Sequence, residues 1–456
     1  MSDDMRVEVG CYGSTFGAKT PNIDALANSG VRFDRNYCQF PLCNPSRASL
    51  LTGRKPAKTG VLGNRTDFRV AHPDWTTLPQ LLKDNGYITV RAGKIFPGGI
   101  DDAKSWGEVS DRGGPTDDGS GAAAGKTLVV PRAQIPTPQG ALPPLPADTS
   151  RAAYSDRIVV LEGNGEAHGD YLTAQRTIAN LHKFKDQPFF IACGFVKPHS
   201  PTTAPQKFFD LYDADKIQLT PDFAAWPTVP PGFPPAAIRK RNADLFIGRG
   251  ASQAEAKQVI RAYLASISWV DWNIGRVIGE LTQLGLRDNT IIVFLADHGY
   301  QLGEKGKWSK AGSLFEMGTR VPLIISAPGA KGNGQSCTRI VESLDLYPTL
   351  VELLGQSPQK DVEGVSLAPL LNDPSSPWDR PGYSVWSEDG KTFHGVAVRT
   401  EKWRYAEFGQ NGVNGAMLFD PHADPLEMKN LANDPQYRSV VAELSILTRK
   451  YAAELA

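Results

Sequence analysis

The chain has 456 residues, with 49 basic and 49 acidic side chains and a formal net charge of zero. This length is too great for one small core and favours a large domain accompanied by a smaller one. The balanced charge argues against a nucleic-acid or membrane-surface partner, because proteins that bind such partners usually have an excess of basic side chains. No apolar run is long enough to span a bilayer.

The N-terminal segment reads MSDDMRVEVGCYG and contains an acidic pair, Asp3 and Asp4. It has neither the basic start nor the apolar stretch of a signal peptide. An acidic pair near a chain end is usually solvated, so its position alone does not indicate a site.

Four apolar runs rich in β-branched and aromatic residues predict buried parallel strands. They cover residues 87–92, 188–195, 290–297 and 321–327. Apolar residues at helical spacing predict helices around them, at 76–86, 170–184, 256–285 and 342–355. This alternation predicts an α/β fold with a large mixed, mostly parallel sheet flanked by helices, whose ligands bind beyond the carboxyl ends of the strands.

Two regions depart from this alternation. Residues 97–168 are rich in Gly, Pro, Ala and Asp, which predicts a long surface excursion with little regular structure. After residue 372, alternating segments separated by Gly-containing turns predict an antiparallel meander, and residues 437–455 predict a closing helix. We therefore expect a large α/β domain at 1–372 and a small C-terminal α+β subdomain at 373–456.

Acidic and imidazole side chains occur where a metal site would need them. Asp297 and His298 end the strand predicted at 290–297, although an isolated Asp-His-Gly is as readily a strand-end turn as a site. If Asp3 and Asp4 join them, three carboxylates and an imidazole form an oxygen-dominated pocket. Such a pocket suits a hard divalent cation, Ca²⁺ or Mg²⁺.

Basic residues also follow the predicted strands or lie in nearby loops: Arg47, Lys94, Lys197 and Lys310. Each could be a solvated surface charge, as most lysines are. If they converge, they form a site for a tetrahedral oxyanion such as sulfate or phosphate. His199 could then protonate a leaving group, or it could be an ordinary capping or core histidine.

Cys43 does not suit such a pocket as a thiol. A hard cation prefers oxygen ligands, and nearby carboxylates raise the pKa of a thiol and weaken it as a nucleophile. The cysteines are odd in number and form no Cys-x-x-Cys motif, which argues against a disulfide framework or a zinc ribbon. They lie at positions 11, 38, 43, 193 and 337. Cys43 is therefore either structural or chemically altered in the mature protein.

The segment CNPSRASLLTG, residues 43–53, resembles the type I sulfatase signature, Cys-x-Pro-Ser-Arg followed by Thr-Gly. The resemblance continues in chain order through GYITVRAGKIF, FFIACGFVKPHSP, IIVFLADHGYQLGEKGKWSK and TRVPLII. The segments GCYG and VKPH and the Asp297–His298 pair are most similar to the iduronate-2-sulfatase-like sulfatases. The resemblance implies the fold of the alkaline phosphatase superfamily, with the catalytic domain at 1–372.

The resemblance also implies a modified residue and a metal. A maturation enzyme would oxidise Cys43 to formylglycine, whose aldehyde hydrates to a geminal diol. The family's metal is usually Ca²⁺, with Mg²⁺ as the alternative. It would be bound by residue 43 together with Asp3, Asp4, Asp297 and His298. Arg47 and Lys94 would hold the diol, Lys310 would neutralise the sulfate oxygens, and His199 would lie near the leaving oxygen.

The implied reaction is hydrolysis of a sulfate ester by covalent catalysis. One diol oxygen attacks sulfur, the alcohol leaves with a proton from His199 or Lys310, and the second hydroxyl expels sulfate and restores the aldehyde. The implied substrate is a small-molecule or oligosaccharide sulfate ester, such as a uronate 2-sulfate. The alternatives are a phosphonate or phosphate diester hydrolase of the same superfamily, and a degenerate, non-catalytic protein with this fold.

Two features depart from the family pattern. Pro97 stands where the most similar group has a histidine that helps to complete turnover, and His72 is a candidate to replace it. The family's opening apolar strand is also missing, so Asp3 and Asp4 are expected on a mobile end beside an unpaired gap in the sheet. We expect the chain to derive from a longer protein, and the resemblance favours a periplasmic or secreted location.

Overall fold

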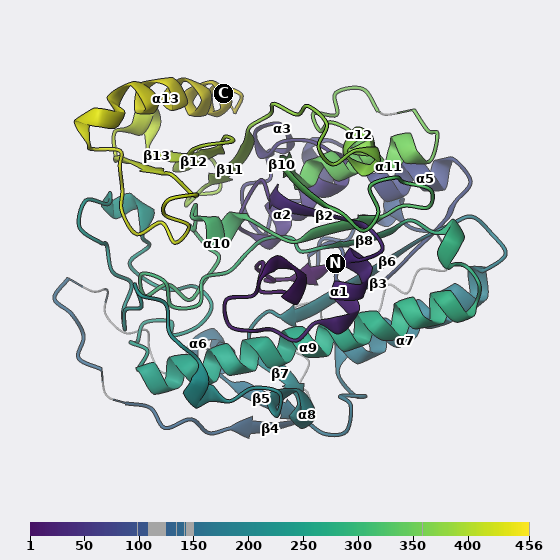
Figure 1. The fold of residues 1–456 in the computed structure, drawn as a ribbon, viewed down its shortest axis with the longest axis horizontal. Coiled ribbons are helices and arrows are strands. Elements are labelled where there is room, and N and C mark those ends of the chain that lie inside the picture. The colour runs from purple at the N-terminus through teal and green to yellow at the C-terminus, as the bar shows by residue number, and fades with distance from the viewer. Residues whose placement is uncertain are drawn as a thin grey trace.

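The computed structural model describes residues 1–97, 99–107, 125–133, 135–140, 142, 150–357 and 359–455. Its centre is a large sheet made of two hydrogen-bonded parts (Figure 1). The first part has the order β3-β6-β1, with strands β3 (Ile88–Gly93), β6 (Phe189–Pro198) and β1 (Ser2–Asp3). The second has the order β10-β2-β9-β8, with β10 (Ser336–Glu342), β2 (Val31–Tyr37), β9 (Leu323–Ser326) and β8 (Ile292–Leu295).

A parallel bridge between Ser2 and Ala296 joins the two parts through β1 and β8. Strands β3, β6, β1 and β8 are thus parallel neighbours, and β2 is parallel to β10. The predicted parallel direction of residues 321–327 is wrong, because β9 is antiparallel to both β2 and β8. An apolar run shows that a strand is buried on both faces but does not show its direction.

Strand β1 contains two residues, yet the acidic pair that it carries is not on a loose end. Asp3 and Asp4 are both fully buried. The Met1 amino group donates to the Cys193 carbonyl at 2.9 Å, and the Phe195 amide donates to the Met1 carbonyl at 2.9 Å. The expected mobile end is therefore replaced by a pair of carboxylates fixed inside the sheet.

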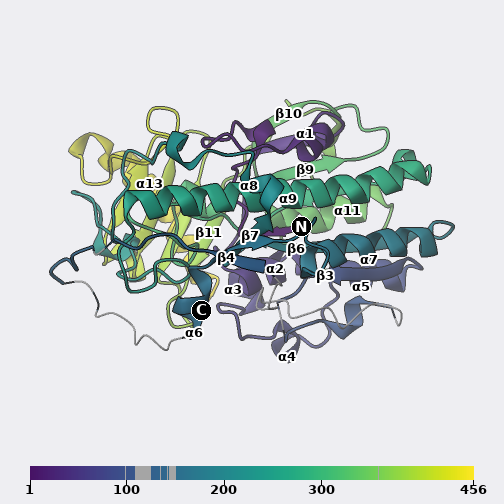
Figure 2. The same cartoon turned by 90° about the horizontal axis from the view of Figure 1, so that it is seen from below.

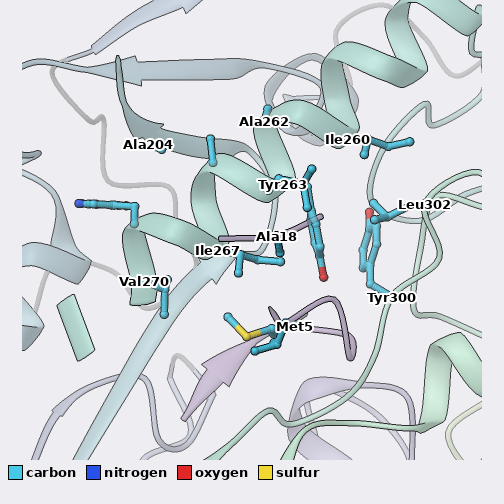
Figure 3. Close-up of a cluster of buried hydrophobic side chains, with 14 of the residues drawn as sticks. Met5, Ala18, Ala204, Ile260, Ala262, Tyr263, Ile267, Val270, Tyr300 and Leu302 are labelled. Atoms are coloured by element: carbon cyan, nitrogen blue, oxygen red, sulfur yellow. The ribbon is translucent and has the colours of Figure 1, made fainter. Parts of the chain in front are cut away.

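Two long helices cover one face of the sheet, α7 (Gly169–Phe184) and α9 (Gln253–Gln283) (Figures 1 and 2). Helix α9 begins with a capping box, in which Ser252 and Glu255 satisfy each other's backbone amides. Its buried side chains, including Tyr263 and Ile267, pack near Met5 and Tyr300 (Figure 3). The segment that follows the acidic pair is therefore packed directly against α9.

The opposite face is covered by shorter helices: α2 (Cys43–Thr52), α5 (Leu78–Asp84), α11 (Leu346–Leu353) and α12 (Ala368–Asn372). The remaining helices are α1 (Pro21–Ala27), α3 (Pro56–Thr59), α4 (Phe68–Ala71), α6 (Ser150–Ser155), α8 (Gln206–Phe209) and α10 (Glu316–Thr319). All ten residues of α2 are buried. The helix predictions at 76–86, 170–184, 256–285 and 342–355 are confirmed to within a few residues.

The region predicted as an irregular excursion contains more structure than expected. Strands β4 (Gly125–Leu128) and β5 (Ile158–Leu161) form a separate three-stranded sheet with β7 (Thr202–Pro205). Each strand has only four residues, too few for a clear alternation of apolar and polar side chains. Parts of the predicted excursion, such as 108–124 and 143–149, lie outside the described residues.

The predicted C-terminal meander is confirmed. Strands β11 (Gly382–Trp386), β12 (Gly395–Arg399), β13 (Arg404–Phe408) and β14 (Ala416–Phe419) form an antiparallel sheet, which helix α13 (Arg438–Ala453) covers (Figure 1). Among the described residues, no helix is both long and apolar enough to cross a membrane.

Candidate active site

The candidate residues meet at the carboxyl edge of the four parallel strands. Asp3 ends β1, Asp297 and His298 follow β8, Lys94 follows β3, and His199 follows β6. Because the strands are parallel neighbours, these positions reach the same edge of the sheet. Helix α2 begins at this edge with Cys43, whose side chain is 4% exposed.

Four predicted ligands form one compact group: Asp3, Cys43, Asp297 and His298, whose ligand atoms all lie within 4.8 Å of one another. The Cys43 Sγ is 3.4 Å from Asp3 Oδ1 and 3.4 Å from His298 Nε2. All four residues are buried.

The fifth predicted ligand, Asp4, lies beside this group. Its Oδ1 is 3.5 Å from His298 Nδ1 and 2.9 Å from Lys310 Nζ. Asp4 adopts a left-handed backbone conformation with φ of 61°, which is uncommon for a residue with a Cβ. This conformation turns the chain sharply after β1, so that two consecutive carboxylates both reach the site.

The predicted cations surround the carboxylates. The Arg47 Nε donates to Asp297 Oδ2 at 2.9 Å, and its Nη1 donates to the Lys94 carbonyl at 2.7 Å. The Lys94 ammonium pairs with Asp3 and lies 3.8 Å from Cys43 Sγ. Arg47 is fully buried, so it both neutralises Asp297 and fixes the backbone that carries Lys94.

The electrostatics show a crowded, closed cluster. Burial opposes ionisation of Asp3, but Lys94 and Arg47 hold its pKa well below the usual value. Burial raises the pKa of Asp4 to about 7, opposed by Lys310 and aided by Asp3. Burial would lower the pKa of His298, but Asp297 and Cys43 raise it to about 10. The carboxylates and the imidazole bring mainly oxygen donors close together, and this donor set fits a hard divalent metal.

His199 and Lys197 follow the same strand but point to different partners. The His199 Nδ1 contacts the Ser200 carbonyl at 2.7 Å, and a carbonyl can only accept, so Nδ1 carries a proton. Its Nε2 then faces the site, 4.0 Å from Asp4 Oδ2. The Lys197 ammonium instead donates to the carbonyls of His199 and Pro201 at 2.8 and 2.7 Å, so it supports this loop rather than joining the predicted oxyanion group.

The structure also describes Pro97, which departs from the family pattern, and His72, the candidate to replace the missing histidine. Pro97 is buried three residues after Lys94. The His72 ring stacks on Trp75 with a centroid distance of 3.6 Å. No interaction between described residues links His72 to Cys43, so nothing in its placement supports it as a replacement histidine.

Three further residues that the sequence did not reveal support the site. Asp244 lies 3.2 Å from Lys310 Nζ. Asp170 accepts hydrogen bonds from the Val196 and Lys197 amides, each at 2.8 Å, and so fixes the end of β6. The Tyr263 hydroxyl donates to the Asp4 carbonyl at 2.6 Å. In the sequence, Asp244 looks like an ordinary acid in a loop, Asp170 like the start of a helix, and Tyr263 like one apolar residue of a helical pattern.

Sequence comparisons with known proteins point to sulfatases. A family model described as Sulfatase matches residues 1–356, and one described as N-sulphoglucosamine sulphohydrolase, C-terminal, matches residues 303–453. A sulfatase of Formosa agariphila is 31% identical over 98% of this chain and 85% of its own length. Iduronate 2-sulfatase of Homo sapiens is 30% identical over 95% of this chain and 90% of its own length.

Solved structures share the fold. The phosphonate monoester hydrolase of Silicibacter pomeroyi superposes with a TM-score of 0.74 at 24% identity, covering 100% of this chain and 94% of that one. This likeness confirms the predicted α/β architecture of the alkaline phosphatase and sulfatase type.

Proposed function

The chain belongs to the sulfatase family and is an enzyme that hydrolyses sulfate esters; from this premise we propose that it acts on a sulfated carbohydrate through an oxidised Cys43 and a divalent cation. The observation that carries the proposal is the environment of Cys43. The Cys43 Sγ lies 3.4 Å from the Asp3 carboxylate and the His298 imidazole and 3.8 Å from the Lys94 ammonium, within a group of oxygen-rich ligands. A sulfur at this position suits a hard cation poorly. A formylglycine hydrate at the same position would offer oxygen to a hard cation and hydroxyl groups to Lys94.

The metal would be Ca²⁺ or Mg²⁺, held by Asp3, Asp297, His298 and residue 43, with Asp4 completing the set. When bound, it would act as a Lewis acid that polarises the sulfate ester and favours ionisation of a nearby hydroxyl. The donor set is rich in oxygen and contains one imidazole, which suits either ion.

The remaining residues bind the sulfate and direct the protons. Lys94 holds residue 43 in place, while Arg47 keeps both Asp297 and the Lys94 backbone fixed. Lys310, 2.9 Å from Asp4, would neutralise the sulfate oxygens. The departing alcohol oxygen needs a proton, which Lys310 would deliver, or His199 once Nε2, the ring nitrogen that faces the site, has itself been protonated.

The substrate proposal follows from the relatives. One relative is named iduronate 2-sulfatase, which supports a sulfated uronate or related sugar as the substrate here. The second candidate is hydrolysis of a phosphonate or phosphate diester, since a phosphonate monoester hydrolase shares the fold over the whole chain.

Three measurements on one preparation separate these candidates. The protein is coexpressed with a formylglycine-generating enzyme. The mass of the peptide that contains residue 43 is measured by mass spectrometry to detect conversion of CH₂SH to CHO, and the metal content of the protein is measured. The sulfate ester and a phosphate diester of one alcohol are then compared by kcat/KM. Cys43→Ala should abolish turnover, whereas Cys337→Ala, at an equally buried cysteine in β10, should not.

Each candidate has its own outcome. A higher kcat/KM for the sulfate ester supports the proposal, and a clear preference for the phosphodiester replaces it with the second candidate. An unmodified Cys43 without copurified metal and without turnover would overturn the proposed roles of Cys43 and the cation.

A further inference from the structure

Two buried charged groups that the proposed mechanism does not use surround the turn that carries His199. Asp170, in the first turn of α7, is 1% exposed, and Lys197, near the end of β6, is fully buried. Burying a charge is costly unless hydrogen bonds satisfy it. The partners of these two groups therefore show what each of them holds in place.

Asp170 holds the end of β6 with both of its carboxylate oxygens. Its Oδ1 accepts from the Val196 amide and its Oδ2 accepts from the Lys197 amide, each at 2.8 Å. The carboxylate therefore fixes two consecutive peptide groups just ahead of His199 in the chain. The His199 amide in turn donates to the Val196 carbonyl at 3.1 Å, so the turn closes on a residue that Asp170 fixes.

Lys197 ties the same turn together from within. Its ammonium donates to the His199 carbonyl at 2.8 Å and to the Pro201 carbonyl at 2.7 Å. The Ser2 hydroxyl, beside Asp3 in β1, donates to the Lys197 carbonyl at 2.6 Å. Lys197 therefore connects the strand that carries the acidic pair to the backbone of His199.

The imidazole of His199 takes its orientation from this turn. Its Nδ1 donates to the Ser200 carbonyl at 2.7 Å, which belongs to the same turn. Its Nε2, 4.0 Å from Asp4 Oδ2, is the atom that faces the site. The direction of the ring therefore follows from the backbone of residues 196–201, which the two buried charged groups hold.

We propose that Asp170 and Lys197 are positioning residues for His199, which hold its Nε2 where the alcohol oxygen of the substrate leaves. The inference rests on the proposed function and adds two residues to it. Misplacing a group at the reacting atoms by about 1 Å can cost about 100-fold in rate, so a loosened turn should slow cleavage. An ammonium of Lys197 that bound the sulfate directly would instead act independently of His199.

The test is a double-mutant cycle on one sulfate ester, with the matured, metal-loaded enzyme. Asp170→Asn replaces one acceptor oxygen with an amide group that donates, facing a backbone N–H that also donates. Lys197→Met removes the ammonium but keeps most of the side-chain length. Each variant should lower kcat by about 10- to 100-fold with little change in KM. In a His199→Gln background, the same substitutions should lower kcat by less than about twofold.

Asp271→Asn is the matched control. Asp271 is also 1% exposed, and its Oδ1 accepts from the consecutive amides of Asn22 and Ile23 at 3.0 and 2.8 Å. These amides lie at the start of α1, so the control perturbs the same kind of contact at another helix. It should keep kcat near the value of its parent with and without His199, and thermal unfolding records the stability that each variant loses.

The proposal is wrong if either substitution leaves kcat unchanged, lowers it by the same factor with and without His199, or acts only by raising KM. It is also wrong if His199→Gln keeps the wild-type kcat, because the positioned group then does not act on the leaving oxygen. If one of the two variants does not fold, the cycle with the other decides. A wild-type enzyme that cleaves no sulfate ester would mean instead that the proposed function has failed.

Discussion

Replacing Tyr263 with phenylalanine should weaken the metal site without touching a metal ligand. The Tyr263 hydroxyl donates to the Asp4 carbonyl at 2.6 Å and accepts from the Arg6 amide at 3.1 Å. It therefore links the two peptide groups on either side of Met5, directly after Asp4, whose left-handed backbone costs about 1–2 kcal/mol. The ring of Tyr263 is buried against Tyr300, and phenylalanine would keep that packing (Figure 3).

The magnitude follows from the two groups that lose their partner. A buried backbone donor or acceptor left unsatisfied costs about 1–3 kcal/mol, so Tyr263→Phe should lower the free energy of unfolding by an amount near the upper end of that range. Loss of a group that orients a metal ligand typically costs about 10-fold to 100-fold in metal affinity. We therefore expect Ca²⁺ or Mg²⁺ to bind at least about tenfold more weakly, because Asp4 is free to relax.

The assay is isothermal titration of the metal-free protein with Ca²⁺ and Mg²⁺, alongside thermal unfolding. Tyr347→Phe is the matched control, since Tyr347 is fully buried in α11 and its hydroxyl donates to the Thr76 carbonyl at 3.1 Å, away from the site. The control should lose about 0.5–1.5 kcal/mol of stability and retain its metal affinity. Equal metal affinities in the two variants would refute the reasoning.

Three further predictions concern other parts of the chain. His168 accepts from the Asp170 amide, and burial, with the charge of Lys197, lowers its pKa to about 3. The stabilising contribution of neutral His168 is complete above pH 6.5 and declines as the pH falls towards 3. His168→Asn, which retains an N-cap, should therefore recover about 2 kcal/mol of this loss at pH 5, measured by denaturation curves. An unchanged acid sensitivity would contradict the assignment. Gly194→Ala would place a Cβ 1.9 Å from the Lys94 carbonyl oxygen. The substitution should therefore lower the free energy of unfolding by about 1–3 kcal/mol or more and reduce kcat/KM. A variant with wild-type activity and the wild-type melting temperature would count against this packing. Cys43→Ser should release at most one product per site in a burst assay, because serine has a single hydroxyl, and sustained turnover would show that a second oxygen is not needed.

The sequence predicted the elements better than their directions or partners. The strand that ends at Asp297 and the helix that contains Tyr263 were both expected, because apolar spacing reports burial along a short segment. The antiparallel direction of β9 was not, since direction depends on the connection between strands. Apolar spacing did not separate Lys94 from Lys197 either, because both follow apolar strands. Only the family resemblance singled out Lys94, and the folded loops decide which ammonium meets Asp3.

The acidic pair shows why the site depends on distant parts of the chain. Strand β1 offers Asp3 and Asp4 little backbone support, yet both are fully buried. Asp3 is held by Lys94, which comes from the end of β3, and Asp4 is held by Tyr263 of α9 and by Lys310. These partners lie 91 to 306 residues away in the sequence. The placement of the two carboxylates is thus set by three separate contacts, which is why the loss of one hydroxyl should lower metal affinity as well as stability.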